Sequence, residues 1–279
     1  MALSDRDTYL TPDGPSIGLL ARHVPALPFY LRVLCVVIRA SWKARRGVYD
    51  ADQWVASSES VVRALESVGM RLNVEGLGVL RSFDGPAVFV ANHLSTLETF
   101  VLPCLIQPSK PVTFVVKESL VRYPLFGPVM RSRDPITVGR ANPREDLAAV
   151  LEGGAERLAR GISVIVFPQG TRHPEVQAGQ FNSLGAKLAV RARVPLVPVA
   201  IDSRAWGTGR RVKDVGPLFP GIPVRLRFGE ALPPAGRGNE NHDAAVRFIV
   251  ETVAAWRNEP AEPRRTADSP SSWSDSTAS

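Results

Sequence analysis

The stretch Ala87-Val88-Phe89-Val90-Ala91-Asn92-His93-Leu94-Ser95-Thr96-Leu97-Glu98 runs from an apolar segment directly into a polar turn and a helix start. A short apolar run bounded by turn residues is typical of a buried strand. Ligand sites in open parallel sheets gather at the carboxyl ends of strands, where His93 stands. The stretch therefore predicts a strand, a turn and a helix within a parallel sheet, with His93 at the edge that carries function.

The spacing of His93 and Glu98 limits how they can meet. Residues five apart in one continuous helix lie about 140° apart around its axis, so they could not touch. We therefore expect His93 in the turn and Glu98 in the first helical turn, pointing back. Its carboxylate would then bond one ring nitrogen and leave the other to act as a general base. Two alternatives remain open, a structural histidine and a capping box formed by Ser95 and Glu98.

A second polar turn follows the apolar run 162–167. It reads Pro168-Gln169-Gly170-Thr171-Arg172 and supplies a flexible glycine, a hydroxyl and a guanidinium. These groups suit an anion such as phosphate. Because both turns follow strands, we expect His93 and Arg172 to converge on one crevice.

The remaining pattern alternates strands with helices. With 279 residues and 44% hydrophobic content, the chain can bury one substantial α/β core. We predict a mostly parallel mixed sheet flanked by helices. Asp50 is expected to cap a helix to about Val68, and Asn142-Pro143 to start another that ends near Arg160. The expected strands are 87–91, 112–116, 135–138, 162–167, 196–201 and 224–228.

Four motifs in this order resemble the 1-acylglycerol-3-phosphate acyltransferase family of membrane glycerolipid synthesis. They are Asn92-His93-Leu94-Ser95-Thr96-Leu97-Glu98, Asp134-Pro135-Ile136-Thr137-Val138-Gly139-Arg140, Phe167-Pro168-Gln169-Gly170-Thr171-Arg172 and Val194-Pro195-Leu196-Val197-Pro198-Val199-Ala200. Val116-Lys117-Glu118-Ser119-Leu120 and the following Pro-x-x-Gly turn also look like the family's segment between the first two motifs. The likeness covers roughly residues 72–230.

The resemblance implies transfer of a fatty acyl group to the free hydroxyl of a lysophospholipid. The donor would be acyl-CoA or acyl carrier protein, and 1-acylglycerol-3-phosphate is the leading acceptor, which would yield phosphatidic acid. His93 would be the base, Glu98 would orient it, and Arg140 and Arg172 would hold the acceptor's phosphate. The same motifs give further substrate-binding residues, Lys117, Gln169, Gly170 and Thr171. No cofactor is implied beyond the donor itself.

Two residues depart from the family pattern. Glu98 stands where relatives have aspartate, which adds a methylene, and Gln169 stands where they have glutamate, which removes a negative charge. These changes leave open an acceptor with another head group, or a non-catalytic lipid-binding protein on the same fold. A serine hydrolase using Ser95 is a weaker alternative, because no G-x-S-x-G motif is present.

Composition points to an acidic partner. The formal charge of +7 and a pI near 9.9 favour an anionic surface. Aromatic residues are few and are not interleaved with the basic ones, so we expect an anionic membrane and no nucleic acid, with a generally basic soluble surface as the alternative. The loop 204–213 is basic, and we expect a solvated connection there, with contact to head groups or donor phosphates as the alternative.

The N-terminal region favours a membrane surface. The apolar run 29–38 is interrupted by Arg32 and is too short to span a bilayer. We expect an amphipathic helix lying on a membrane, anchored by the basic residues Arg39, Lys43, Arg45 and Arg46. A helix packed on the core with a solvated basic end is the alternative.

Three segments are expected from the sequence. They are a membrane-associating helical segment 1–49, an α/β acyltransferase domain 50–258 and a disordered tail 259–279. The first residues do not resemble a signal peptide, so the expected location is the cytoplasmic face of a membrane, peripheral or monotopic. Cys35 and Cys104 are expected to be buried thiols, and no metal site is expected.

Overall fold

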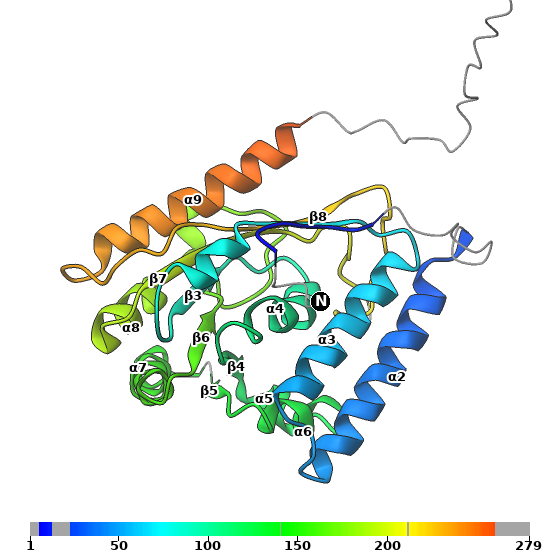
Figure 1. Cartoon of the computed structure of the whole chain (residues 1–279), viewed down its shortest axis with the longest axis horizontal. Helices are drawn as coiled ribbons and strands as arrows, with labels where there is room; N and C mark the ends of the chain where they lie inside the picture. The colour runs from blue at the N-terminus through cyan, green and yellow to red at the C-terminus, as the bar shows by residue number, and fades with distance from the viewer. Residues whose placement is uncertain (1–5, 13–22, 140, 211, 260–279) are drawn as a thin grey trace, which may run out of the picture.

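The computed structural model describes residues 6–12, 23–139, 141–210 and 212–259, and within them a mixed sheet forms the centre of the molecule (Figure 1). The strand order is β1-β2-β8-β7-β3-β6-β4-β5. The run from β7 to β5 is parallel, β8 is antiparallel to β7, and β2 is parallel to β8. The predicted mostly parallel mixed sheet is therefore confirmed. The strands are β1 Tyr9–Leu10, β2 Leu72–Glu75, β3 Val88–Ala91, β4 Val112–Lys117, β5 Ile136–Val138, β6 Ser163–Val166, β7 Leu196–Asp202 and β8 Val224–Phe228.

Helices cover both faces of this sheet. Alternate side chains of β3 enter different cores, because successive residues of a strand point to opposite faces. Phe89 packs with residues of the helices Ala26–Arg45, Ala51–Glu66 and Leu97–Ile106. Val88 and Val90 pack with residues of the helices Pro143–Ala159, Leu184–Ala192 and Asn239–Asn258. The helices are α2 Ala26–Arg45, α3 Ala51–Glu66, α4 Leu97–Ile106, α5 Glu118–Arg122, α6 Phe126–Arg131, α7 Pro143–Ala159, α8 Leu184–Ala192 and α9 Asn239–Asn258, with short 3₁₀ turns at Leu77–Arg81 and Ala178–Gln180. The expected flanking by helices is confirmed.

The expected helix starts at residues 50 and 142 both occur. The Asp50 side chain accepts a hydrogen bond from the backbone N–H of Gln53 (2.9 Å), and Asn142 does the same for Arg144 (3.1 Å). Each bond satisfies a donor that the first helical turn leaves without a partner. The two helices end at Glu66 and Ala159, close to the predicted ends.

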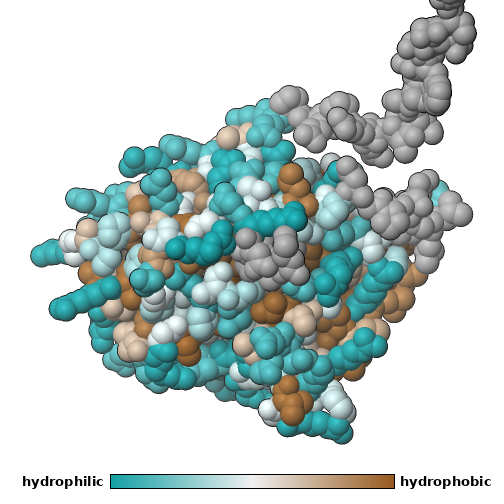
Figure 2. All heavy atoms as spheres, in the orientation of Figure 1, coloured by the Kyte–Doolittle hydropathy of each residue, from teal (hydrophilic) through white to brown (hydrophobic). Residues whose placement is uncertain are grey.

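Helix α2 has one buried and one exposed apolar face. Phe29, Val33 and Ala40 are buried, and α2 lies beside α3 (Figure 1). The exposed face carries Leu27, Leu31, Leu34, Ile38 and Trp42, each between 46% and 54% exposed. Figure 2 shows hydrophobic surface in the part of the molecule where α2 lies. Helix α2 thus packs on the core, as the alternative predicts, and still presents apolar surface on its other face; contact with a membrane stays a prediction.

The first 49 residues differ from expectation in two respects. Residues 9–10 form β1 and extend the sheet by pairing with β2, so this segment is not helical throughout. Cys35 is exposed, which corrects the prediction of a buried thiol; the apolar run hid the fact that it also covers the outward face of α2. Cys104 is buried, as predicted. None of the described helices is both long enough and apolar enough to cross a bilayer. All of the predicted tail except Glu259 lies outside the described residues.

Candidate active site

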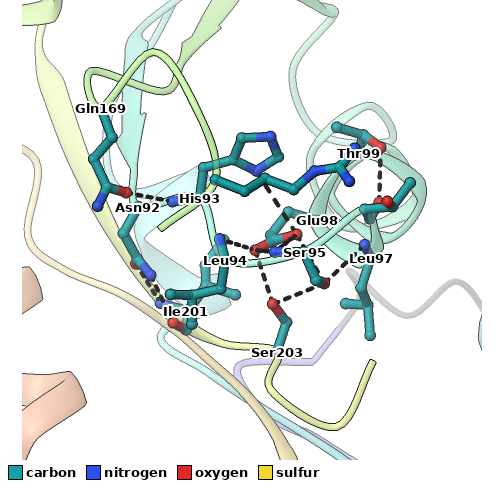
Figure 3. Close-up of polar contacts among 12 residues, drawn as sticks. Asn92, His93, Leu94, Ser95, Leu97, Glu98, Thr99, Gln169, Ile201 and Ser203 are labelled. Atoms are coloured by element: carbon teal, nitrogen blue, oxygen red, sulfur yellow. Dashed lines mark hydrogen bonds and ion pairs between the residues drawn. The ribbon is translucent and has the colours of Figure 1, made fainter. Parts of the chain in front are cut away.

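His93 lies in the turn between β3 and α4, as the spacing predicts. The residue before it fixes this turn: the Asn92 side chain donates to the Ile201 carbonyl and accepts from the Ile201 N–H, both at 2.8 Å (Figure 3). Asn92 is fully buried. Because Ile201 belongs to β7, this amide ties the end of one strand to its neighbour. The sequence showed Asn92 beside His93 but gave no sign of this partner, which is 109 residues away.

The His93 ring is held between Phe167 and Glu98. It stacks on Phe167 with ring centroids 4.4 Å apart, and its side chain is 15% exposed. Nδ1 lies 3.9 Å from Oε2 of Glu98 (Figure 3). That separation is typical of an ion pair and is too long for a hydrogen bond. The expected hydrogen bond between these two atoms is therefore not formed, but the carboxylate does point back from the first turn.

Glu98 is fully buried and accepts hydrogen bonds from two segments of the chain. Its Oε1 accepts from the backbone N–H of Leu94 (2.7 Å), from that of Ser95 (2.9 Å) and from Oγ of Ser203 (2.8 Å). The contact with the Ser95 N–H is one half of the predicted capping box, whereas Oγ of Ser95 accepts from the N–H of Leu97 (3.1 Å). Glu98 therefore both caps the turn and faces the His93 ring, because the extra methylene lets the side chain fold back onto the turn while Oε2 stays near the ring. Ser203 was not anticipated, since a lone serine after a strand carries no signal.

Gln169 connects the two motifs through the backbone of His93. Its Oε1 accepts from the His93 N–H (2.7 Å), and its Nε2 donates to Oε1 of Gln180 (2.8 Å). The carbonyl of His93 in turn accepts from the N–H of His173 (3.0 Å). The peptide groups on either side of His93 are thus held by the second turn. A glutamine suits this place because its amide both accepts and donates.

A cavity of about 530 Å³ opens in front of His93. Four of the predicted substrate-binding residues line it together with His93: Lys117, Gln169, Gly170 and Thr171. Gly170 has a φ of +71°, a conformation that favours glycine. Lys187 of α8 also lines the cavity and was not anticipated. Much of the remaining lining is apolar, including Phe114, Val116, Leu120, Val138, Leu147 and Phe167.

Only one of the two arginines predicted to bind phosphate can be placed. Arg140 lies outside the described residues. Arg172 is absent from the lining of this cavity and lies beside the start of α4, where Nη2 donates to Oδ1 of Asp214. The same Oδ1 accepts from Oγ1 of Thr96 (2.9 Å). The two turns do meet, since Gln169 binds the backbone of His93, but the prediction that Arg172 shares a crevice with His93 was wrong, because its guanidinium turns to the carboxylate of Asp214.

The loop that carries Asp214 is more than a solvated connection. It follows β7, and Ala205 and Trp206 within it are buried. Trp206 packs edge-on against Phe29 of α2, with centroids 4.9 Å apart, and stacks on Phe100 of α4 at 6.0 Å. The prediction of a solvated loop is therefore right for exposed residues such as Thr208, Arg210 and Lys213 but wrong for the start of the loop, because Trp206 packs into the core.

Comparisons with known proteins agree with this geometry. Residues 71–202 match the family model described as Acyltransferase. The 1-acyl-sn-glycerol-3-phosphate acyltransferase of Pseudomonas aeruginosa is 32% identical over 191 residues, which cover 67% of this chain and 70% of that protein. The chloroplastic enzyme of the same name from Arabidopsis thaliana is 33% identical over 140 residues, half of this chain but 37% of that protein.

A solved structure shows the same fold. The crystal structure of the 1-acyl-sn-glycerophosphate (LPA) acyltransferase from Thermotoga maritima superposes with a TM-score of 0.64 and 21% sequence identity, covering 85% of this chain and 96% of that one. The matched range of the family model contains both polar turns, His93 and Arg172. From these sequence matches, the chain belongs to the 1-acyl-sn-glycerol-3-phosphate acyltransferase family.

Proposed function

We propose that this O-acyltransferase moves a fatty acyl group from acyl-CoA or acyl carrier protein to the free hydroxyl of 1-acylglycerol-3-phosphate, giving phosphatidic acid. The observation that carries the proposal is the placement of His93 at a cavity, with the Glu98 carboxylate 3.9 Å behind its Nδ1. The names of the relatives support the choice of acceptor. The reaction needs no further cofactor, because the thioester donor is itself activated.

In the proposed mechanism, Nε2 of His93 takes the proton of the acceptor hydroxyl. The alkoxide-like oxygen attacks the thioester carbonyl, the carbon–sulfur bond breaks, and the proton passes from His93 to the leaving thiolate. A hydroxyl is a poor nucleophile near neutral pH, so this step depends on the base. Glu98 stabilises the imidazolium that forms, and no covalent enzyme intermediate is required because the site brings donor and acceptor together.

The substrate contacts in this proposal fall in two places. Lys117 and the turn 169–171 line the cavity and supply a cation, a hydroxyl and backbone groups to one substrate. Arg172, together with Arg140, is proposed to bind the acceptor's phosphate, since a guanidinium matches phosphate geometry. Lys187 adds a second cation to the cavity. We propose no contact with nucleic acid.

We also propose that α2 rests on the cytoplasmic face of an anionic membrane. Tyr123 and Leu125 are also exposed apolar residues. Arg45 at the end of α2 donates a hydrogen bond to the carbonyl of Pro124, the residue between them, and so brings both next to the exposed face of α2. Arg39 and Arg46 flank this face and are exposed. Apolar residues entering the interface and cations meeting anionic head groups are the two terms that hold such helices to membranes.

The proposed reaction is tested by radiolabelled acyl transfer. Folded protein and lipid vesicles are incubated with acyl-CoA or acyl carrier protein as donor and a panel of lysolipids as acceptors, and products are separated by chromatography. We expect labelled phosphatidic acid from 1-acylglycerol-3-phosphate. A different labelled product would keep the mechanism and replace the acceptor. Absence of transfer with every pair, with lipid binding retained, would favour the non-catalytic alternative.

The membrane contact is tested with Cys35, which lies on the exposed face of α2. Cys104 stays unlabelled because burial raises the pKa of its thiol to about 12. We expect anionic vesicles to slow labelling of Cys35. Changing Leu34 and Ile38 together to glutamine is expected to weaken vesicle partitioning by at least about tenfold, since each side chain loses apolar contact.

The matched control for this experiment is Leu10→Gln. Leu10 is 64% exposed but belongs to β1, away from the face of α2. The Leu10→Gln variant should partition onto vesicles as the wild type does, and vesicles should slow the labelling of its Cys35 to the same extent. Equal loss of partitioning in both variants, or labelling of Cys35 at the same rate with and without vesicles, would contradict the proposed surface.

A further inference from the structure

The loop after β7 touches both polar groups of the site. We call it the 203–218 loop; residue 211 within it lies outside the described residues. At its start, Oγ of Ser203 donates to the Glu98 carboxylate, and farther on Asp214 accepts from the guanidinium of Arg172. One loop therefore contacts the group behind the base and the cation assigned to the phosphate.

The contacts of Asp214 are those of a residue that holds the guanidinium of Arg172 in place. A carboxylate that occupies a guanidinium in place of phosphate frequently uses both oxygens in a bidentate fork. The described contacts of Asp214 use one oxygen, Oδ1, and this oxygen is shared with the hydroxyl of Thr96 (2.9 Å). The carbonyl of Lys213 lies 3.5 Å from Nη1 of Arg172. Asp214 thus links Arg172 to the start of α4 while the guanidinium, with five N–H donors, retains capacity for a ligand.

The backbone beside Asp214 is fixed. The N–H of Val215 donates to the carbonyl of Val212 (2.9 Å). The hydroxyl of Tyr30 accepts from the N–H of Gly216 (2.8 Å) and donates to its carbonyl (2.7 Å). A Cβ at Gly216 would lie 1.8 Å from the carbonyl oxygen of Gly207, so no side chain fits there. These contacts hold Asp214 in one place.

The holder of this loop is α2. The Tyr30 ring packs edge-on against Trp206 of the loop, with centroids 5.9 Å apart, and against Phe29 at 5.1 Å. The phenol reaches Gly216 from a helix 186 residues away in sequence. The chain of contacts therefore runs from α2 through the 203–218 loop to Arg172.

We propose that Asp214 is a positioning residue that holds the guanidinium of Arg172 where the phosphate of the acceptor binds. Asp214 acts through Arg172 and touches no substrate itself. Asp214 lowers the KM for a phosphate-bearing acceptor and does not affect the proton transfer at His93. This inference rests on the proposed function, in which Arg172 binds that phosphate.

The test measures KM for 1-acylglycerol-3-phosphate, KM for acyl-CoA, and kcat. We expect Asp214→Ala to raise the acceptor KM about tenfold, the loss of one charge-assisted contact, with kcat and the donor KM changed less than about twofold. Asp214→Asn keeps an oxygen for both Thr96 and Arg172, so its acceptor KM should stay within about threefold of the wild type. Asp243→Ala on α9 is the control carboxylate.

The outcomes separate this inference from the proposed function. If Arg172→Ala leaves the acceptor KM unchanged, the phosphate role of Arg172 fails. If Arg172→Ala raises it while Asp214→Ala leaves it unchanged or lowers it, Asp214 is a bystander or a competitor and only this proposal is overturned. Should Asp214→Ala fail to fold, Tyr30→Phe replaces it, because it removes both bonds to Gly216; an unchanged acceptor KM in that variant equally overturns the proposal.

Discussion

Replacing His93 with alanine is expected to lower kcat by about 100- to 10,000-fold, the usual contribution of a positioned base. The variant removes the stacking of the ring on Phe167 and its contact with Glu98 but leaves the backbone hydrogen bonds of His93 in place, so it should fold. We expect binding of the acceptor to vesicle-bound protein to change little, because the phosphate contacts are assigned to other residues. The measurement is initial rate against acceptor concentration, with thermal unfolding followed by circular dichroism.

The control for this variant is another histidine. His242→Ala on α9 lies in a different layer of the fold and should keep wild-type rates. Loss of activity in both variants would indicate general destabilisation. Equal turnover by His93→Ala and the wild type would remove the proposed mechanism altogether, whatever the identity of the acceptor.

Replacing Glu98 with glutamine is expected to have the second largest effect. The amide keeps the shape of the side chain and one oxygen for the backbone N–H groups of the turn, but it removes the charge 3.9 Å from Nδ1 of His93. At an effective dielectric constant of about 20, opposite charges at 4 Å attract by about 4 kcal/mol. Because only the imidazolium formed during the reaction gains from this attraction, we expect kcat to fall on the order of 1,000-fold, with KM nearly unchanged.

The same variant separates the two roles of Glu98. Its amide nitrogen faces Ser95, whose N–H and hydroxyl now contact Oε2 at 3.2 Å, so we expect a loss of about 1–3 kcal/mol in the free energy of unfolding. Glu59→Gln on α3 serves as the matched surface change. A lower stability with a wild-type kcat would assign Glu98 to capping alone.

Much of the site was predictable because it is encoded locally. The interval between His93 and Glu98 excluded a single helix and required a turn, and the structure has that turn. The apolar runs before each polar turn predicted β3 and β6 by length and composition. The caps at Asp50 and Asn142 followed from side chains that bond their own next turn, which no distant contact needs to support.

The contacts that complete the site could not be predicted in this way. Ser203, Asn92 and Gln169 act on groups 76 to 109 residues away, and those pairings exist because β3 lies between β6 and β7. Strand order is a property of the whole sheet, and the local pattern carries no record of it. The same holds for Asp214, whose partner Arg172 lies 42 residues earlier.

Two errors in local structure have a simpler origin. Cys35 was expected inside because it lies in the apolar run 29–38, and such a run does not reveal which of its residues face the core. Strand β2 was missed although Leu72 and Val74 are buried and their neighbours are not, a period-two pattern that was too short to stand out. In both cases the burial was decided by packing against distant segments.

The paired bonds of Asn92 to Ile201 have a consequence for the energetics of turnover. A side-chain amide that both donates to and accepts from one residue of the next strand behaves as an extra rung of the sheet, one step beyond the end of β3. His93 therefore has the rigidity of a strand residue although it belongs to a turn. The conformational entropy of fixing the base is lost once, when the chain folds, so no further entropy is lost in ordering His93 when a substrate binds.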